Sequence, residues 1–298
     1  MGGSIRRIVI TGANKGIGLA TARAALEHSD DVSVLLGARD PQRGRDAIDS
    51  LCREQPDWAS RLDLLQIDVA DTQSVASARD RVVDTCGAEP APLYGIVNNA
   101  GIGLRSTDMR AVLEVNTLGV KRVCDAFVPL IEPAGRVVNV SSASGPNFVS
   151  RCSPQLQEFF RDGSVTWKAV EDFIEQVIRS RNDEERLGAL GMGDSDAYGF
   201  SKACVNLYTL ILAREVPQLF INACTPGYIE TDLTRPHAEA RGVAPSDLGM
   251  KPPLQGTVPI MALLFDDPRG SGHYYGSDAR RSPLDRYRAP GDPEYTGE

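Results

Sequence analysis

The sequence has 298 residues, of which 42% are hydrophobic, and its formal net charge at pH 7 is −8. A chain of this length and composition can bury one large α/β core, so we expect a single domain. The acidic balance and the lack of any long basic run argue against nucleic acid or an anionic membrane surface as a partner. No apolar run approaches the roughly 18 residues that a membrane span needs, so none is predicted.

The six cysteines are scattered along the chain and form no C-x-x-C pair. This pattern predicts neither a disulfide framework nor a zinc site, and the three histidines lie too far apart to suggest a metal ligand set. Reduced thiols are typical of the cytosol. The first residues pass straight into an apolar run without a secretory pattern. We therefore expect a cytoplasmic protein that binds no metal.

Short apolar runs alternate with stretches of helical periodicity along most of the chain. The predicted strands are 8–11, 32–38, 62–69, 94–98, 136–140 and 220–224, and the predicted helices are 18–27, 42–54, 72–85, 107–130 and 196–215. The strands are β-branched and almost continuously apolar, as in a parallel sheet covered on both faces. We predict the α/β class: a Rossmann-type doubly wound parallel sheet, helices on both faces, with ligands at the carboxyl ends of its strands.

Two segments interrupt this alternation. Residues 150–194 separate the fifth strand from the last predicted helix and include an amphipathic stretch from Trp167 to Ile178, which predicts a packed helical insertion. Residues 276–298 contain three prolines and several charges, which indicate an extended or partly disordered tail. The domain prediction is one dinucleotide-binding Rossmann domain over 1–298, with this insertion and this tail.

A glycine-rich loop, T-G-A-N-K-G-I-G, runs from Thr11 to Gly18 after the first predicted strand. Glycines here let the backbone turn tightly and approach a pyrophosphate, which the free N–H groups of the next helix can face. The alternative is a glycine-rich turn that binds nothing. The residues predicted to contact a dinucleotide in this loop are Gly12, Asn14, Lys15, Gly16, Ile17 and Gly18.

The end of the second predicted strand bears on which dinucleotide is bound. Gly37-Ala38-Arg39 offers no acidic side chain for a ribose 2′-hydroxyl, the group that an NAD site holds. Arg39 and Lys15 are instead two cations suited to a 2′-phosphate, so we predict NADP(H) over NAD(H). Asp40 could still touch the ribose or pair with Arg39, and Arg39 could be a solvated loop charge.

Polar residues also close the third and fourth predicted strands. Asp68, followed by Val69, could accept a hydrogen bond from the adenine amino group or cap the next helix. In the N-N-A-G run at 98–101, asparagines can tie neighbouring strand ends together while Gly101 leaves room for a cofactor. The predicted cofactor contacts here are Asp68, Val69, Asn99, Ala100 and Gly101.

Tyr198 and Lys202 stand four positions apart, so in a helix both side chains project from one face. An ammonium about 4 Å from a phenolate contributes on the order of 4 kcal/mol at an effective dielectric of about 20, which moves the tyrosine pKa towards neutrality. A phenol tuned in this way transfers protons efficiently. The same spacing also recurs by chance on solvated helices.

With these residues in place, the chain resembles the short-chain dehydrogenase/reductases from about Arg6 to Leu264. The resemblance rests on motifs in family order: the glycine loop, N-N-A-G, Asn116 in E-V-N-T, Ser141-Ser142, Tyr198 with Lys202, and Pro226-Gly227. The interval from Ser142 to Tyr198 is 198 − 142 = 56 positions, longer than in most of the family. The insertion that fills it resembles that of the carbonyl-reductase branch.

This resemblance implies NADPH-dependent reduction of a ketone, aldehyde or quinone carbonyl to the alcohol. Tyr198 is then the proton donor, Lys202 holds the nicotinamide ribose and lowers the tyrosine pKa, and Ser142 positions the substrate oxygen. Asn116 holds a water that links Lys202 to solvent, its alternative being a buried asparagine that kinks a helix. The further cofactor contacts implied are Pro226, Gly227, Ile229 and Thr231, the last of which could instead cap the next helix. The insertion of that branch covers the helix face through which relatives oligomerise, which implies a monomer.

The chain departs from that branch in the short stretch between Gly101 and Asn116 and at Tyr228, where the branch often has tryptophan. We expect pocket walls from 143–148, Tyr228 and the proline-interrupted lid 233–250, whose apolar character favours a bulky aliphatic or aromatic small-molecule substrate. One alternative is a catalytically idle NADP-binding sensor or scaffold, which would not need all four catalytic candidates. Another is a sugar-nucleotide epimerase, which would need more than the 298 − 226 = 72 residues that follow Pro226.

Overall fold

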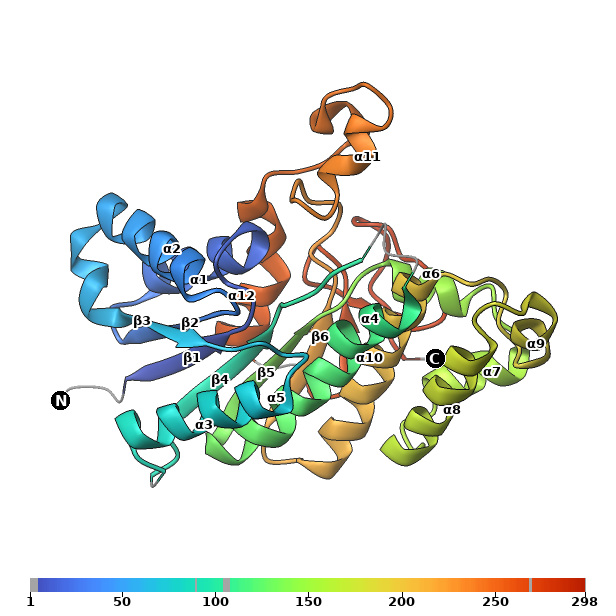
Figure 1. Cartoon of the computed structure of the whole chain (residues 1–298), viewed down its shortest axis with the longest axis horizontal. Coiled ribbons are helices and arrows are strands. Elements are labelled where there is room, and N and C mark those ends of the chain that lie inside the picture. Colours follow the sequence, from blue (N-terminus) through green and yellow to red (C-terminus); the bar gives the residue numbers. More distant parts are fainter. Residues whose placement is uncertain (1–4, 89, 104–107, 268–269, 298) are drawn as a thin grey trace.

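The computed structural model describes residues 5–88, 90–103, 108–267 and 270–297 and contains a single sheet in the order β3-β2-β1-β4-β5-β6-β7-β8 (Figure 1). All neighbouring pairs are parallel except β7 with β8. Helices cover both faces, which confirms the predicted fold class. The strands are β1 (Arg6–Ile10), β2 (Val32–Ala38), β3 (Leu62–Gln66), β4 (Leu93–Asn98), β5 (Ile131–Val140), β6 (Phe220–Cys224), β7 (His273–Tyr275) and β8 (Arg281–Ser282).

Two apolar cores sandwich the sheet, because successive side chains of a strand point to opposite faces. In β1, Ile8 and Ile10 enter one core and Val9 enters the other. The first core is closed by α1 (Gly16–His28), α2 (Pro41–Glu54) and α12 (Val258–Phe265). The second is closed by α3 (Thr72–Cys86), α5 (Gly119–Phe127) and α10 (Ala197–Glu215). This layering leaves the carboxyl ends of the strands to carry a site.

The helix predicted over 107–130 is subdivided in the structure. It comprises α4 (Met109–Leu113), a π-helical turn η2 (Glu114–Leu118), α5, and the short 3₁₀ helix η3 (Val128–Leu130); Thr107, its predicted start, lies outside the described residues. A π turn inside an α-helix is uncommon and occurs often at functional sites. Asn116 lies within it.

The insertion is helical, as predicted, and holds α7 (Pro154–Arg161), α8 (Trp167–Ser180) and α9 (Glu184–Ala189). With α6 (Ser144–Val149) these helices form a third core against the outer face of α10. Its centre is aromatic: Phe200 of α10 packs against Phe148 and Phe160, with ring centroids 5.6 Å and 6.4 Å away. The insertion lies beside α10 at one end of the molecule (Figure 1). α10 is therefore covered on its sheet side and on its outer side.

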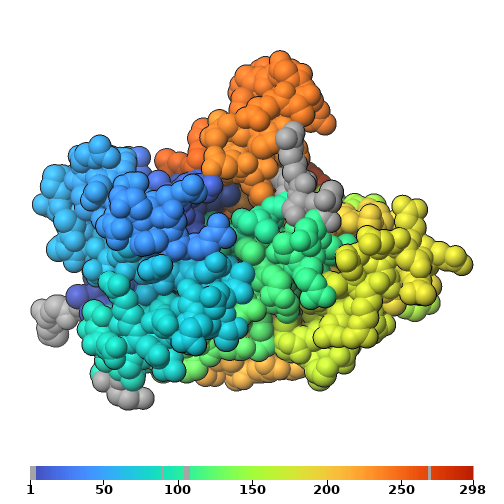
Figure 2. All heavy atoms as spheres, in the orientation of Figure 1, coloured from blue at the N-terminus to red at the C-terminus, as the bar shows by residue number. Residues whose placement is uncertain are grey.

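After β6 the chain forms α11 (Arg235–Glu239), the 3₁₀ helices η4 (Pro245–Leu248) and η5 (Pro253–Thr257), and α12. The part with α11 and η4 stands out of the surface as a separate lobe (Figure 2). Another 3₁₀ helix, η1 (Pro56–Arg61), precedes β3. Among the helices of the described residues, none combines the length and hydrophobicity that a membrane span requires.

In place of an extended or partly disordered tail, the residues after β7 form a hydrogen-bonded structure. Arg288 is the reason: its guanidinium is buried, pairs with Asp278, and donates to Ser282 Oγ (3.0 Å) and the carbonyl of Asp292 (2.8 Å). The Tyr295 amide also donates to the carbonyl of Arg281, at 3.0 Å. One arginine thus organises a proline-rich segment whose composition alone indicates disorder.

Candidate active site

The glycine loop at 12–18 is held against the end of β4. The Thr11 hydroxyl accepts hydrogen bonds from the amides of Asn99 (3.0 Å) and Ala100 (3.1 Å). In return, the Asn99 side-chain amide donates to the carbonyls of Thr11 (2.9 Å) and Gly12 (3.2 Å). The two segments predicted to bind a dinucleotide therefore form one rigid unit.

Two glycines of this loop meet steric demands that no other residue satisfies. Gly12 has φ +64°, and a Cβ on it would lie 2.9 Å from the Cα of Ala100. A Cβ on Gly18 would lie 2.5 Å from Asn99 Nδ2. Within the described residues α1 receives no side-chain cap at Lys15, whereas aspartates cap α2, α3 and α10. Free N–H groups at a glycine-lined helix N-terminus fit a phosphate group.

Replacing Gly12 with alanine is expected to lower the free energy of unfolding more than the matched change Gly242→Ala. Both glycines have φ +64°, so each variant loses about 1–2 kcal/mol to the left-handed backbone. Gly242 has open space around it, whereas Gly12 meets Ala100, which adds about 1–3 kcal/mol of overpacking. Urea denaturation of the two variants measures the difference. Equal losses would contradict the close approach at Gly12.

The residues predicted for the adenosine end lie beside one another, just after β2 and β3. Arg39 is 77% exposed, and its Nε lies 4.0 Å from a carboxylate oxygen of Asp68. Asp40 caps α2 by accepting from the amides of Gln42 and Arg43. Asp68 does not cap α3, because Asp71 does so. Of the two cations predicted to bind a 2′-phosphate, Arg39 therefore has the less constrained side chain.

Lys15 forms an ion pair with a different carboxylate. Its Nζ forms an ion pair of 2.6 Å with Asp232, which lies 217 positions later in the chain. Thr231 flanks this pair, since a Cβ on Gly16 would meet its Cγ2 at 3.4 Å. The structure therefore brings the glycine loop against the segment after β6, and it places Lys15 and Arg39 on separate carboxylates.

Strand ends and α10 are joined by a chain of buried amides. Asn98 donates to Asn139 Oδ1 at 2.8 Å, and Asn139 donates to Thr209 of α10 at 2.9 Å. These bonds link β4, β5 and α10 in one network, as the N-N-A-G motif predicts for its first asparagine. The network fixes the helix that carries Tyr198 and Lys202 relative to the sheet.

Tyr198 and Lys202 lie in the first two turns of α10, which is capped by Asp196 through the amide of Gly199 (2.9 Å). The Lys202 Nζ lies 5.6 Å from the centroid of the Tyr198 ring and donates to the carbonyl of Val140 at 2.9 Å. Lys202 is buried, whereas Tyr198 is partly exposed. The two side chains converge from one helix face, as their spacing predicts.

Ser142 is the serine that faces the phenol. Its hydroxyl is close enough to Tyr198 to lower the pKa of the phenol, and its Oγ accepts from the amide of Ser144 at 3.1 Å. Ser141 is buried and bonds the carbonyl of Lys202 at 3.3 Å, so it belongs to the support of the helix. The adjacent serines, which follow β5 directly, thus have different partners.

Burial dominates the titration of both groups. It raises the pKa of Tyr198 to about 12, against a smaller opposing effect of the nearby Ser142 side chain, and lowers the pKa of Lys202 to about 8. Burial therefore outweighs any lowering of the tyrosine pKa by Lys202, and the pKa does not approach neutrality as the spacing on the helix predicts. The Lys202 Nζ lies 5.6 Å from the ring centroid, and desolvation penalises the charged form of each group.

Asn116 is fully buried, and its side-chain amide is satisfied on both sides. Its Oδ1 accepts from the amide of Ile102 (2.9 Å), while Nδ2 donates to the Ile102 carbonyl (2.9 Å) and to Ser201 Oγ (3.1 Å). Gly101 lies alongside, since a Cβ there would be 3.4 Å from Asn116 Oδ1 and 3.9 Å from Lys202 Nζ. The side chain thus joins the N-N-A-G loop to α10 at the π turn.

The predicted cofactor contacts after β6 line the same end of the sheet. Gly227 has φ +91°, and its amide donates a hydrogen bond to Thr225 Oγ1 (3.2 Å), which closes a turn. Ile229 pairs with Lys251 in an isolated bridge and reaches Gly256 beside Ile17 of α1. Val69, at the other side, is buried against Gly119 of α5. These contacts place the loop after β6 over the first turn of α1.

Several residues of the site were missed by sequence reasoning. Thr11 and Ser201 form hydrogen bonds with residues of other motifs, but nothing in the sequence around either residue predicts those bonds. Asp232 follows the predicted Thr231, yet nothing local ties it to Lys15. Among the described residues, no three His, Cys, Asp or Glu side chains gather in a way that could hold a metal ion.

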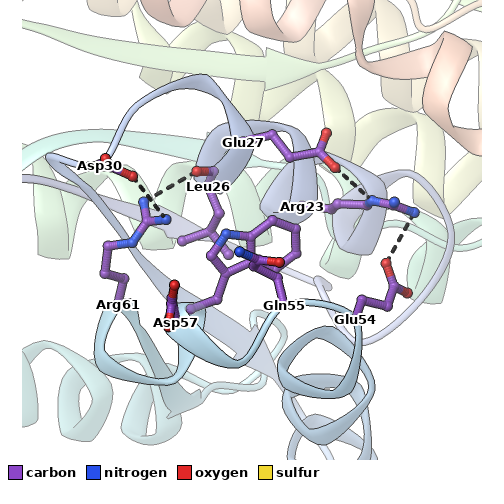
Figure 3. A pocket seen from close by; sticks show the side chains of 9 residues that line it. Arg23, Leu26, Glu27, Asp30, Glu54, Gln55, Asp57 and Arg61 are labelled. Carbon is purple, nitrogen blue, oxygen red and sulfur yellow. Dashed lines mark hydrogen bonds and ion pairs between the residues drawn. The ribbon is translucent and has the colours of Figure 1, made fainter.

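A hollow of about 400 Å³ lies at the carboxyl end of α1, at the opposite end of that helix from the glycine loop (Figure 3). Arg23 in its wall pairs with Glu27 (3.0 Å) and Glu54 (3.2 Å). Arg61 donates to the carbonyl of Leu26 (3.2 Å) and faces Asp30. Because the lining charges satisfy one another, we assign this hollow a structural role.

Comparison with known proteins agrees with this geometry. The family model described as short chain dehydrogenase matches residues 6–153. "Carbonyl reductase [NADPH] 3" of Rattus norvegicus is 34% identical over 88% of this chain and 96% of its own length. "Carbonyl reductase [NADPH] 1" of Homo sapiens is 33% identical over 94% and 99%.

Solved structures with the same fold include salutaridine reductase from Papaver somniferum, with a TM-score of 0.73 and 25% identity over 91% of this chain and 99% of that one. The NADPH-bound carbonyl reductase from chicken fatty liver gives a TM-score of 0.66 at 22% identity, over 94% and 99%. The resemblance stated from the motifs, including its carbonyl-reductase-like character, is confirmed. On the identity and coverage of these relatives, the chain belongs to the short-chain dehydrogenase family.

Proposed function

We propose that this protein is an NADPH-dependent carbonyl reductase in which Tyr198 gives the proton to the substrate oxygen. The observation that carries the proposal is the meeting of Ser142, Tyr198 and Lys202 at the sheet edge that also holds the glycine loop. An uncapped α1 and an exposed Arg39 suit the phosphates of NADPH. When bound, NADPH supplies the hydride for the carbonyl carbon.

Tyr198 is suited to proton donation because its raised pKa keeps the phenol protonated at neutral pH. Ser142 lies beside the phenol, so a carbonyl oxygen bound between the two hydroxyls would receive two donors. After the proton has left, the buried Lys202 stabilises the phenolate, and its bond to Val140 fixes its position. Asn116 has no free side-chain donor left, so its relay water would be held by the backbone of the π turn.

The rate of carbonyl reduction is expected to fall as pH rises through about 8. Lys202 is charged below its pKa of about 8 and neutral above it, so the phenolate loses its stabilising cation on the alkaline side. Tyr198 stays protonated across this range and does not cause the loss. We would measure kcat/KM against pH from 6 to about 10 at saturating NADPH. An identical alkaline limb in the weakly active Lys202→Met variant would contradict the assignment.

The substrate is proposed to be a bulky aliphatic or aromatic ketone, aldehyde or quinone. Tyr228 and Ile102 are both 37% exposed beside the site, and Tyr228 is held to the lid by a 3.3 Å bond from its hydroxyl to His237 Nδ1. The test is NADPH consumption against a panel of ketones, aldehydes and quinones. No turnover with tight NADPH binding would favour the alternative, an idle NADP-binding sensor or scaffold.

We further infer that the protein acts as a monomer in the cytosol. Val170 and Ile174 of α8 are buried in the core that covers the outer face of α10. That face is therefore unavailable as a helix-to-helix contact between subunits. The six cysteines are free thiols, which suits a reducing compartment.

A further inference from the structure

Arg122, in the first turn of α5, joins three segments that lie apart in the sequence. Its Nε donates to Thr72 Oγ1 at the start of α3 (3.0 Å), and a second nitrogen donates to the carbonyl of Val69 (2.5 Å). A third nitrogen pairs with Glu114, the first residue of the π turn η2, at 3.4 Å. The side chain is only 19% exposed, so these contacts fix its position.

The carbonyl that Arg122 holds belongs to the loop 67–71, which leads from β3 to α3. Val69 is buried against α5, because a Cβ on Gly119 would lie 3.1 Å from both Val69 Cγ2 and the Val69 carbonyl oxygen. Gly119 and Arg122 are three positions apart and therefore share one side of the helix. The glycine lets the loop approach α5 closely, and the arginine bonds the loop there.

Loop 67–71 also lies against the glycine loop. A Cβ on Gly37, near the end of β2, would lie 3.1 Å from the Cα of Thr11 and 3.2 Å from Ile67 Cγ2. Asp68 comes next, and one of its carboxylate oxygens lies 4.0 Å from the cation proposed to hold the 2′-phosphate of NADPH. These distances place loop 67–71 at the adenosine end of the proposed cofactor site.

Other hydrogen bonds of this loop set its internal shape. The Asp68 amide donates to Ser74 Oγ (2.9 Å), and the Asp71 amide donates to the Asp68 carbonyl (3.1 Å). These bonds fold the loop onto α3. The Arg122 bond instead relates the loop to α5 and, through Glu114, to the π turn. Arg122 therefore fixes where the folded loop stands relative to the rest of the site.

Resting on the proposed function, we propose that Arg122 is a positioning residue for NADPH, because it holds loop 67–71 where the loop can receive the adenine. It acts through Val69 and touches neither the nucleotide nor the substrate. A ligand that carries adenosine depends on this loop, whereas a nicotinamide nucleotide without adenosine does not reach it. A purely structural role would instead lower the affinity for both halves of the cofactor alike.

The test uses adenosine 2′,5′-bisphosphate and nicotinamide mononucleotide, which represent the two halves of NADP⁺. In calorimetry, Arg122→Met should bind the bisphosphate about tenfold more weakly than the unmodified protein and bind the mononucleotide equally well. Arg122→Lys keeps a donor for the Val69 carbonyl and should recover most of this loss. With a ketone that the unmodified protein reduces, Arg122→Met should raise the KM for NADPH about tenfold and leave kcat within about twofold.

Lys121→Met is the matched control, because it removes the same charge from the preceding residue. Lys121 pairs with Asp125 within α5 at 2.5 Å, and its Nζ lies over the Trp167 ring, 5.7 Å from the centroid. This variant should bind both ligands as the unmodified protein does. It separates the loss of the contact to loop 67–71 from the loss of a positive charge near an anion.

A second perturbation of the same contact leaves Arg122 in place. Gly119→Ala puts a Cβ against Val69, so it should give the same selective loss of bisphosphate affinity, and it serves as the test if thermal denaturation shows that Arg122→Met is unfolded. Unchanged bisphosphate affinity in the folded variants, an equal loss in Lys121→Met, or an equal loss for the two ligands would overturn the inference. Selective bisphosphate loss without any carbonyl turnover in the unmodified protein would remove the proposed reaction and keep the positioning role.

Discussion

Replacing Tyr198 with phenylalanine is expected to lower kcat for carbonyl reduction by about 10²–10⁴-fold, the usual contribution of a positioned proton donor. The ring remains, so its packing near Lys202 at 5.6 Å is kept and only the donor hydroxyl is lost. NADPH affinity should change little, because the glycine loop and Arg39 stay intact. Steady-state kinetics and a fluorescence titration with NADPH measure the two quantities separately.

The same substitution at Tyr208, on the same helix, is the matched control. Tyr208 is buried in the core between sheet and helices, where its ring packs on Trp167 with centroids 5.1 Å apart. Tyr208→Phe should leave kcat near that of the unmodified protein. Near-normal turnover in Tyr198→Phe would refute the assignment of the proton donor, and parallel losses in both variants would indicate damage to α10.

Replacing Arg39 with aspartate is expected to raise the KM for NADPH by about 10–100-fold, with a much smaller effect on NADH. A charge-assisted hydrogen bond to phosphate contributes about 1.5–3 kcal/mol, and a carboxylate there also repels the 2′-phosphate. Arg39 is 77% exposed and only loosely paired with Asp68, so its loss should not disturb the fold. Kinetics with each nucleotide at a fixed carbonyl concentration measure the ratio.

Arg45→Asp is the control for net charge, because Arg45 is an exposed residue of α2 that bonds only to Gln42 within that helix among its described contacts. It should leave the NADPH-to-NADH ratio of KM values unchanged. If Arg45→Asp shifts the ratio as much as Arg39→Asp, the effect belongs to the general field of the protein. If the unmodified protein already prefers NADH, the cofactor prediction is wrong.

The parts of the fold that could be predicted are those whose cause is local. Except for β3, whose Asp63 and Gln66 are exposed, the six longer strands are largely buried on both faces, so their apolar runs are visible in the sequence. The glycines of the loop are required by backbone geometry at single positions. β7 and β8 were missed because three and two residues are too short for periodicity. α12 was missed since its residues are apolar on every face and therefore carry no amphipathic pattern.

The interactions that could not be predicted join distant residues or depend on burial. The Lys15–Asp232 pair spans 217 positions, and the bond of Asn116 to Ser201 spans 85. The raised pKa of Tyr198 follows from desolvation, a quantity that spacing on a helix does not contain. The order of the C-terminal residues depends on one buried arginine among many charges.

The two-residue strand β8 also bears on how the edge of the sheet is protected. An open parallel sheet ends in a row of unpaired backbone groups that can template another chain. Here β8 pairs antiparallel with β7 and is followed at once by Pro283, which has no N–H to offer a further strand. The C-terminal residues thus cover this edge of the sheet. We expect that their removal exposes the edge of β7 and promotes edge-to-edge aggregation.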